Sequence, residues 1–163
     1  LNKGGTLWRF RADGWHIVCL THDAEHGRDP QFLEVCAMLG ATGCNLGLPM
    51  GRMPHPESWD LEWLRKKLDR IIQVVDPLLV YTHNARGEYG HPQHVWTHNV
   101  VHRLFPNARD FAAGNETHAG LYRVDLTPEE QAFKAQAACR YVEKTKAIQA
   151  YPWFSAPYEE FIL

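Results

Sequence analysis

The sequence has no long apolar run and no excess of basic charge. None of its hydrophobic stretches approaches the roughly 18 residues that a membrane-spanning helix needs, so we expect no membrane span. Its 17 basic and 19 acidic side chains give a net charge of -2, whereas a protein that binds nucleic acid usually carries a basic stripe. We therefore expect no nucleic-acid partner. No leader with a basic and then an apolar segment opens the sequence, and we expect a cytoplasmic protein.

Several motifs that would indicate a function class are also missing. The cysteines form no C-x-x-C pair and lack the spacing of a zinc knuckle, so we interpret them as thiols of a reducing compartment. There is no G-x-x-x-x-G-K and no G-x-G-x-x-G, which argues against an enzyme that cradles a phosphate. The absence of G-x-S-x-G argues against a serine hydrolase. The four cysteines are Cys19, Cys36, Cys44 and Cys139.

The pattern of apolar residues predicts one α/β domain over residues 1–163. This length suits a single domain, and 45% hydrophobic with 22% charged residues is close to the globular average. Helical and strand-like segments alternate, which is typical of βαβ units with a parallel sheet. We expect a short helical stretch before Gly14, helices at about 29–39, 58–75, 92–104 and 128–142, and strands at 16–20, 44–48, 78–82 and 120–126.

Two of the predicted strands end in similar polar residues. The first is followed by Thr21-His22-Asp23, and the second ends in Thr82-His83-Asn84. In an open α/β sheet, ligands bind beyond the carboxyl ends of the strands. We therefore expect these residues to line one cleft.

The ten histidines are the oddity of the composition, and several follow the second of these strands. His91 and His94 lie three residues apart across the first turn of a predicted helix, so both can face the same point. His98 and His102 continue this face at about one-turn steps. Imidazoles at this spacing can bind one metal ion, but histidines on a helix face are also common as surface or hydrogen-bonded core residues. Spacing alone leaves both interpretations open.

A resemblance to a known family narrows the choice. The segment from Thr82 to His94, T-H-N-A-R-G-E-Y-G-H-P-Q-H, resembles the second signature of the LmbE/PIG-L family of zinc-dependent N-deacetylases, usually a variant of G-x-x-G-H-x-D-H. The G-G-T-L at Gly4 to Leu7 resembles the segment that follows the family's first motif. Gly47-Leu48-Pro49 and Asp76-Pro77 also fall where the family has them. The resemblance covers about residues 4 to 105.

The resemblance implies a Rossmann-like, mostly parallel sheet flanked by helices. It also implies a zinc ion that activates water, in a hydrolase that removes N-acetyl groups from a small-molecule amino sugar or a glycoconjugate substrate. Carried over by position, His94 would be a zinc ligand. His91 would be the catalytic residue that stabilises the tetrahedral oxyanion and protonates the leaving amine.

The sequence departs from the family pattern in two places. The first motif, A-H-P-D-D-E, would provide a His ligand, an Asp ligand and the Asp general base directly before Gly4, but the sequence does not contain it. The first central strand, which leads into that motif, is missing with it. Gln93 stands where the family commonly has Asp. A Gln can accept a hydrogen bond but brings no charge, so we expect His91 to be a weaker acid.

Three explanations of the missing motif stay open. The chain is a truncated deacetylase, or it is a remnant that no longer catalyses and serves as an oligomeric binding or assembly protein, or it holds a substitute metal site. The substitute site would combine His22, Asp23, His83 and His94. Loss of a central strand would leave backbone groups unpaired on both neighbours, so we expect a homo-oligomer.

Two further residues near the expected cleft have open roles. Glu88 is either a replacement general base or a cap of the following turn. Arg86 either holds an oxygen of the substrate or is a solvated charge. The whole candidate cleft comprises His22, Asp23, His83, Asn84, Arg86, Glu88 and Gln93, beside His91 and His94.

Overall fold

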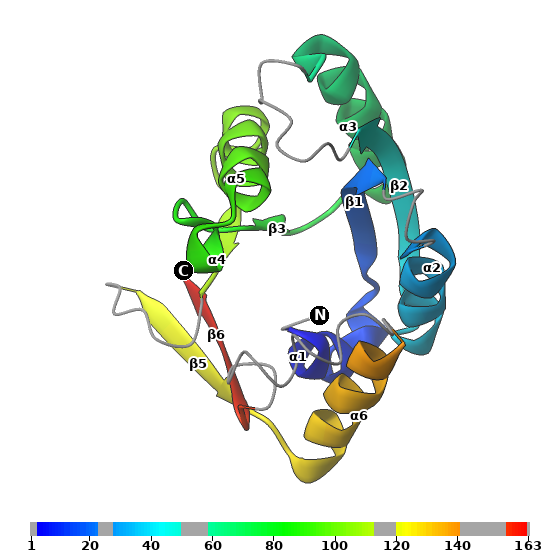
Figure 1. Cartoon of the computed structure of the whole chain (residues 1–163), viewed down its shortest axis with the longest axis vertical. Helices are drawn as coiled ribbons and strands as arrows, with labels where there is room; N and C mark the ends of the chain where they lie inside the picture. Colours follow the sequence, from blue (N-terminus) through cyan, green and yellow to red (C-terminus); the bar gives the residue numbers. More distant parts are fainter. Residues whose placement is uncertain (1–2, 23–27, 50–58, 113–119, 141–155, 163) are drawn as a thin grey trace. The chain divides into compact units, whose positions relative to one another are not determined.

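The computed structural model has the predicted α/β class. It describes residues 3–22, 28–49, 59–112, 120–140 and 156–162, and these form six α-helices, a 3-10 helix and six strands (Figure 1). The helices are α1 (Gly4–Arg9), the 3-10 helix η1 (Arg11–Asp13), α2 (Arg28–Met38), α3 (Leu61–Val75), α4 (Gly87–Gly90), α5 (Pro92–Leu104) and α6 (Pro128–Cys139). The strands are β1 (His16–His22), β2 (Thr42–Pro49), β3 (Tyr81–Thr82), β4 (Arg109–Phe111), β5 (Leu121–Asp125) and β6 (Tyr158–Ile162).

The strands form two sheets. One contains β1 and β2, and the other has the order β3-β4-β6-β5. In the second sheet, β3 and β4 pair in parallel, whereas β4 and β6 pair antiparallel. Neither β4 nor β6 was expected from the sequence.

The predicted strand at 78–82 is too long. Only Tyr81 and Thr82 form β3, and Leu78 is 96% exposed. An apolar run directly after Pro77 reads as a buried strand from its composition alone, but the side chain at its start lies in solvent.

Local sequence signals account for the starts of α3 and α6. The side chain of Asp60 accepts a hydrogen bond from the backbone N–H of Trp63 at the start of α3, and Leu64 and Leu68 of this helix are buried. In α6, Thr127 and Glu130 form a capping box. Within the described part of the chain, no helix combines the length and the apolarity needed to cross a bilayer.

The chain divides into two compact units. The first comprises Leu1–Gly47 and Arg123–Glu159, and the second comprises Leu48–Tyr122 and Glu160–Leu163. Helices α1, α2 and α6 belong to the first unit, and α3, α4 and α5 belong to the second. The single domain over residues 1–163 stays a prediction.

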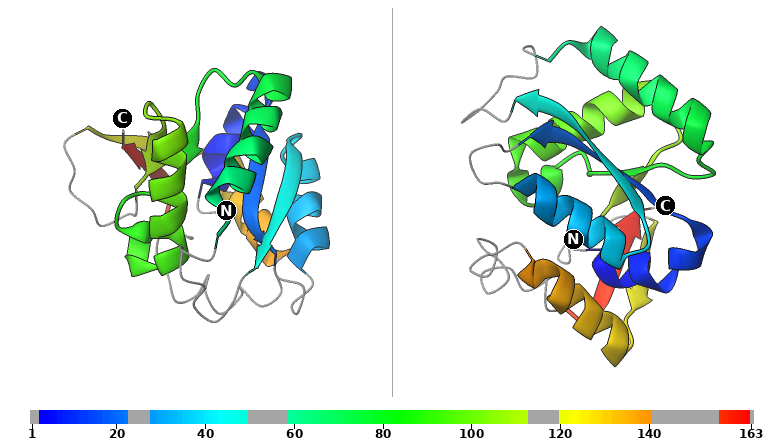
Figure 2. Two further views of the ribbon diagram at one scale, coloured as in Figure 1. Left: turned by 90° about the horizontal axis from the view of Figure 1, so that it is seen from above. Right: turned by 90° about the vertical axis from the view of Figure 1, so that its right-hand side faces the viewer.

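In the first unit, helices pack around a small apolar core. Val35, Leu39 and Ala137 are buried together. Helix α1 packs against α6, and α2 packs against β1 (Figure 2). Trp8 of α1 stacks on Phe133 of α6 with ring centroids 5.4 Å apart. These contacts bury the apolar faces of short helices that would be marginal alone.

A buried ion pair fixes the start of α1 in the same unit. The carboxylate of Glu159 accepts hydrogen bonds from the backbone N–H groups of Gly5 and Thr6, at 3.0 and 2.8 Å. Nζ of Lys134 lies 3.3 Å from Oε1 of Glu159, and the two side chains are 2% and 0% exposed. The G-G-T-L segment is therefore held by a charged group from the far end of the chain.

In the second unit, aromatic residues of three strands pack together. The ring centroid of Tyr81 lies 6.0 Å from that of Phe111 and 5.8 Å from that of Phe161. Helix α5 packs against β3. Thr82, the last residue of β3, is buried next to Tyr81 in the chain. The aromatic packing of Tyr81 therefore fixes the end of β3, where the candidate site begins.

Candidate functional site

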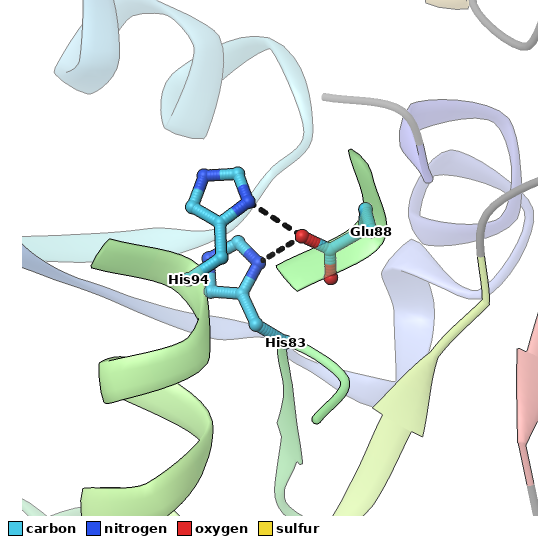
Figure 3. Close-up of side chains that lie close together, drawn as sticks. All are labelled: His83, Glu88 and His94. Atoms are coloured by element: carbon cyan, nitrogen blue, oxygen red, sulfur yellow. Dashed lines mark hydrogen bonds and ion pairs between the residues drawn. The ribbon is translucent and has the colours of Figure 1, made fainter. Parts of the chain in front are cut away.

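The candidate site lies where β3 leads through a short loop and α4 into α5, all within the second unit. His83 directly follows β3, Glu88 lies in α4, and His94 lies in the first turn of α5. Figure 3 shows both imidazole rings turned toward the Glu88 carboxylate. We call His83, Glu88 and His94 the Glu88 cluster.

One carboxylate oxygen joins the two histidines. Oε2 of Glu88 lies 2.5 Å from Nδ1 of His94 and 3.0 Å from Nδ1 of His83. The two rings stack with centroids 3.9 Å apart and planes 14° apart. Because an ionised carboxylate only accepts hydrogen bonds, both Nδ1 atoms carry the donated protons. In a neutral imidazole with its proton on Nδ1, the lone pair is on Nε2, which here lies away from Glu88.

Asn84 organises the loop that presents Glu88. Its backbone N–H donates to Oε1 of Glu88 at 3.1 Å, and its side-chain oxygen accepts from the backbone N–H groups of Arg86 and Glu88. Its amide nitrogen donates to the carbonyl of Phe111 in β4 at 2.9 Å. The loop is thus tied to the neighbouring strand by one buried side chain.

The backbone of this loop is strained at Glu88. Gly87 has a φ of 63°, and Glu88, which carries a side chain, has a φ of 57°. A Cβ atom at Gly87 would lie 3.0 Å from Cγ2 of Val95 and 3.2 Å from Cβ of His94. Left-handed backbone at a residue other than Gly costs on the order of 1 kcal/mol and tends to cluster at functional sites. The close packing at Gly87 also leaves no room for another side chain beside His94.

The charges of the cluster follow from burial and hydrogen bonding. Burial by itself would raise the pKa of Glu88, but the hydrogen bonds and charges of His83 and His94 outweigh it and lower that pKa to about 2. Burial lowers the pKa of His94, although the hydrogen bond to Glu88 acts in the opposite direction. At neutral pH the arrangement therefore favours an ionised Glu88 and a neutral His94.

His91 occupies the N-cap position of α5, next to this cluster, without a capping hydrogen bond from its side chain. Its ring centroid lies 4.5 Å from that of His94 and 5.8 Å from that of Tyr89, and its Nδ1 atom is buried. Pro92 follows as the first residue of the helix. Together, His91 and His94 lie side by side at a helix N-terminus, a position that favours negative charge.

The structure brings only some of the predicted site residues together. His83, Asn84, Glu88, His91 and His94 lie in one region, as described above. Arg86 is exposed, and its backbone N–H donates to Asn84. Gln93 is half-buried, and its backbone carbonyl accepts from the hydroxyl of Thr97. The weaker acidity expected of His91 beside this Gln stays a prediction.

The other predicted strand end lies outside the described residues. β1 ends at His22, but the side chain of His22 and the whole of Asp23 are not described. The shared cleft and the substitute metal site therefore stay predictions. Of the four residues of that substitute site, His83 and His94 lie together in the Glu88 cluster.

The structure adds Asp110, which the sequence analysis did not find. It lies on β4 beside His98 and His102. The two histidines stand out in the sequence by their helical spacing, but Asp110 lies on a three-residue strand with no pattern of its own. No local signal could have found it.

Comparison with protein families decides what kind of protein presents this motif. The profile of the family described as PIG-L, GlcNAc-PI de-N-acetylase, matches residues 1–105, more than half of the chain. The chain belongs to the PIG-L family. The resemblance stated from the G-H-P-Q-H and G-G-T-L segments is thereby confirmed.

Individual PIG-L relatives are distant. The 1D-myo-inositol 2-acetamido-2-deoxy-alpha-D-glucopyranoside deacetylase of Thermomonospora curvata is 27% identical over 150 residues, covering 70% of this chain and 50% of that protein. The chain spans about half the length of the curated relatives it matches.

Solved structures show the same fold. The A40926 pseudoaglycone deacetylase Dbv21 matches with a TM-score of 0.72 at 17% identity, over 98% of this chain and 89% of that one. GalB, the 4-carboxy-2-hydroxymuconate hydratase from Pseudomonas putida KT2440, matches with a TM-score of 0.61 at 15% identity, over 98% and 88%. Because this fold carries both a deacetylase and a hydratase, the function has to be argued from the site.

Proposed function

We propose that the chain acts as a zinc-dependent hydrolase that removes N-acetyl groups from amino sugars or their glycoconjugates. Its membership of the PIG-L family supports this function, as does the G-H-P-Q-H segment at the start of α5. We infer further that His94 is a zinc ligand and that His91 is the catalytic residue.

The observation that carries this proposal is the hydrogen bond between His94 and Glu88. Zinc-ligating histidines usually donate their second ring N–H to a carboxylate, which fixes the ring and makes its other nitrogen a better ligand. Nδ1 of His94 is 2.5 Å from Oε2 of Glu88, so Nε2 is the atom left for a metal. The lowered pKa of His94 keeps that atom without a proton at neutral pH. Imidazole nitrogens are donors that zinc accepts, and the ring of His83 stacks on that of His94.

The proposed reaction breaks the amide C–N bond of an N-acetyl group. A zinc ion held by His94 would supply polarisation of the carbonyl and would lower the pKa of a bound water to about 7. The water oxygen joins the carbonyl carbon, and the products are acetate and a free amine. His91 stabilises the developing negative charge on the carbonyl oxygen and gives a proton to the leaving nitrogen. The water's proton goes to a base, which in the family is an Asp of the first motif, a motif absent from the printed sequence.

The names of the relatives point to a first substrate. Several curated relatives are named for deacetylation of 1D-myo-inositol 2-acetamido-2-deoxy-alpha-D-glucopyranoside. Their names and the family description share an N-acetylglucosamine unit. We infer that the substrate of this chain carries an N-acetylated amino sugar of this kind.

The test is acetate release from that inositol glycoside by the zinc-supplied 163-residue chain. We expect acetate in step with a new primary amine, and its loss in both His91→Ala and His94→Ala. Asn99→Ala, on the exposed side of α5, serves as the matched control and should keep the activity. A chain that binds zinc through His94 but releases no acetate would contradict the hydrolase and favour the non-catalytic binding protein.

A further inference from the structure

A second group of metal-ligand side chains lies on α5 and β4. His98 and His102 are one turn apart on α5, with ring centroids 4.2 Å apart. Oδ1 of Asp110 lies 2.7 Å from Nε2 of His102 and 3.2 Å from Nδ1 of His98. We call these three residues the Asp110 cluster. One potential ligand atom from each residue lies within 4.8 Å of the others.

The fold holds these side chains where they are. Asp110 pairs with Thr82 of β3 on one side and with Ile162 of β6 on the other, so its backbone is fixed inside the sheet. The side chains of His98, His102 and Asp110 are 15%, 28% and 16% exposed. These side chains are mostly buried, but each keeps some exposed surface through which an ion can enter. Such a preformed group needs little rearrangement to admit a metal.

Hydrogen bonds link the atoms of the Asp110 cluster that would bind the metal ion. Nδ1 of His98 lies 2.9 Å from the carbonyl oxygen of His83 and 3.2 Å from Oδ1 of Asp110, so one N–H serves two acceptors. Nε2 of His102 faces the same Asp110 oxygen. One carboxylate oxygen thus gathers two imidazole nitrogens. A cation bound among these atoms would replace the protons that hold them together.

We propose that His98, His102 and Asp110 form a second site for a divalent transition-metal ion of the zinc class. Two imidazoles and one carboxylate are a donor set that zinc accepts, and imidazole also suits cobalt and nickel. The Asp110 cluster shares no side chain with the Glu88 cluster, although His98 contacts the backbone of His83. The ion would link α5 to β4. Because His98 also contacts the carbonyl of His83, the ion would stabilise the chain directly after β3.

The number of zinc ions bound by variants of the untagged chain distinguishes the Asp110 cluster from the proposed catalytic zinc site. His94→Ala removes a ligand of the proposed catalytic zinc and leaves the Asp110 cluster whole, so this variant should keep about one zinc per chain in equilibrium dialysis. Adding His102→Ala should abolish the binding of that zinc or lower its affinity strongly. The loss of affinity should exceed the roughly 10- to 100-fold that is typical when a residue hydrogen-bonded to a metal ligand is removed. Co²⁺ in place of zinc gives an absorption spectrum that reports the same loss.

Two further variants guard against a folding artefact. Asp110→Asn keeps the shape and a hydrogen-bond acceptor but removes the charged ligand, so it should lose the same zinc while its circular dichroism is unchanged. Asn99→Ala, exposed on the same helix, should leave zinc binding intact. The proposal is overturned if His94→Ala binds no zinc, or if its zinc survives both His102→Ala and Asp110→Asn. Neither result depends on whether the chain hydrolyses an amide.

Discussion

Oε2 of Glu88 lies 2.5 Å from Nδ1 of His94, and the same oxygen lies 3.0 Å from Nδ1 of His83. A single buried carboxylate therefore sets the orientation and the tautomer of both rings. In the G-H-P-Q-H segment, this hydrogen bond leaves Nε2 of His94 available to bind the proposed metal ion.

Glu88→Gln should weaken zinc binding at His94. The amide keeps an acceptor for one histidine but carries no charge, and outer-shell changes of this kind cost about 10- to 100-fold in metal affinity. Competition with a chelating dye measures this, best in a His102→Ala background where the second proposed site is disabled. Glu129→Gln, on α6, is the control. An unchanged affinity in Glu88→Gln would show that Glu88 does not support the metal ligand.

Gly87→Ala should disturb His94, whereas Gly90→Ala should not. Both positions have left-handed backbone, so an alanine at either costs about 1–2 kcal/mol of unfolding free energy. A Cβ at Gly90 meets nothing within 4 Å, but one at Gly87 comes within 3.2 Å of Cβ of His94. Denaturant unfolding should show the larger loss for Gly87→Ala, and only that variant should shift the NMR signals of His94. Equal effects of the two substitutions would contradict the packing described at Gly87.

Lys134→Met should destabilise the first unit strongly. The substitution leaves the buried Glu159 carboxylate without its cation, and breaking a buried pair from one side costs about 3–5 kcal/mol. Lys66→Met is the control, because the Lys66 side chain is 66% exposed and its pair with Glu62 lies on the surface, where ion pairs contribute little to stability. Similar denaturation midpoints for the two variants would mean that the Lys134 pair contributes no more than a surface contact.

The pH dependence of stability should include a contribution from Glu130. The hydrogen bond from Arg9 is the main cause that lowers the pKa of Glu130. A carboxyl with a lowered folded pKa adds stability above its unfolded pKa of about 4.3, and this is lost as the pH falls through the folded pKa. Wild type should therefore be more stable than Glu130→Gln at neutral pH, and the two should converge in acid.

Thermal unfolding across the acidic range measures this convergence. The oxygen of the glutamine can still accept from the backbone N–H of Thr127, but the substitution removes the charge together with one of the two acceptors of Arg9. Glu129→Gln should follow wild type at every pH. A constant difference between wild type and Glu130→Gln from acid to neutral pH would rule out the ionised carboxylate as its source.

Local signals predicted the helices well. The start of α3 has Asp60 as a cap and the start of α6 has Thr127 and Glu130 as a capping box, and in both cases the interacting residues are neighbours in the sequence. The strand β4 was missed because it has only three residues, and β6 was missed because its two adjacent glutamates, Glu159 and Glu160, break the apolar pattern of a strand. Their pairing joins segments about fifty residues apart, which no local pattern records.

The residues of the candidate site that local signals mark were predicted, and those that depend on long-range contacts were not. His91 and His94 follow from the motif, and His98 and His102 follow from helical spacing. Glu88 was noticed, but its bridge between His83 and His94 depends on a left-handed turn that its residue type does not suggest. Asp110 reaches the histidines only through the pairing of β4 with β3.

The most direct test of the account is a long-range ¹H–¹⁵N NMR spectrum of the His94 ring at neutral pH, with and without zinc. His94→Ala assigns the signals. The account predicts a proton on Nδ1 and none on Nε2 before zinc is added, and a shift of the Nε2 signal alone when zinc binds. A proton on Nε2, or a zinc-dependent shift at Nδ1, would contradict the assignment of Glu88 as the partner that presents His94 to the metal.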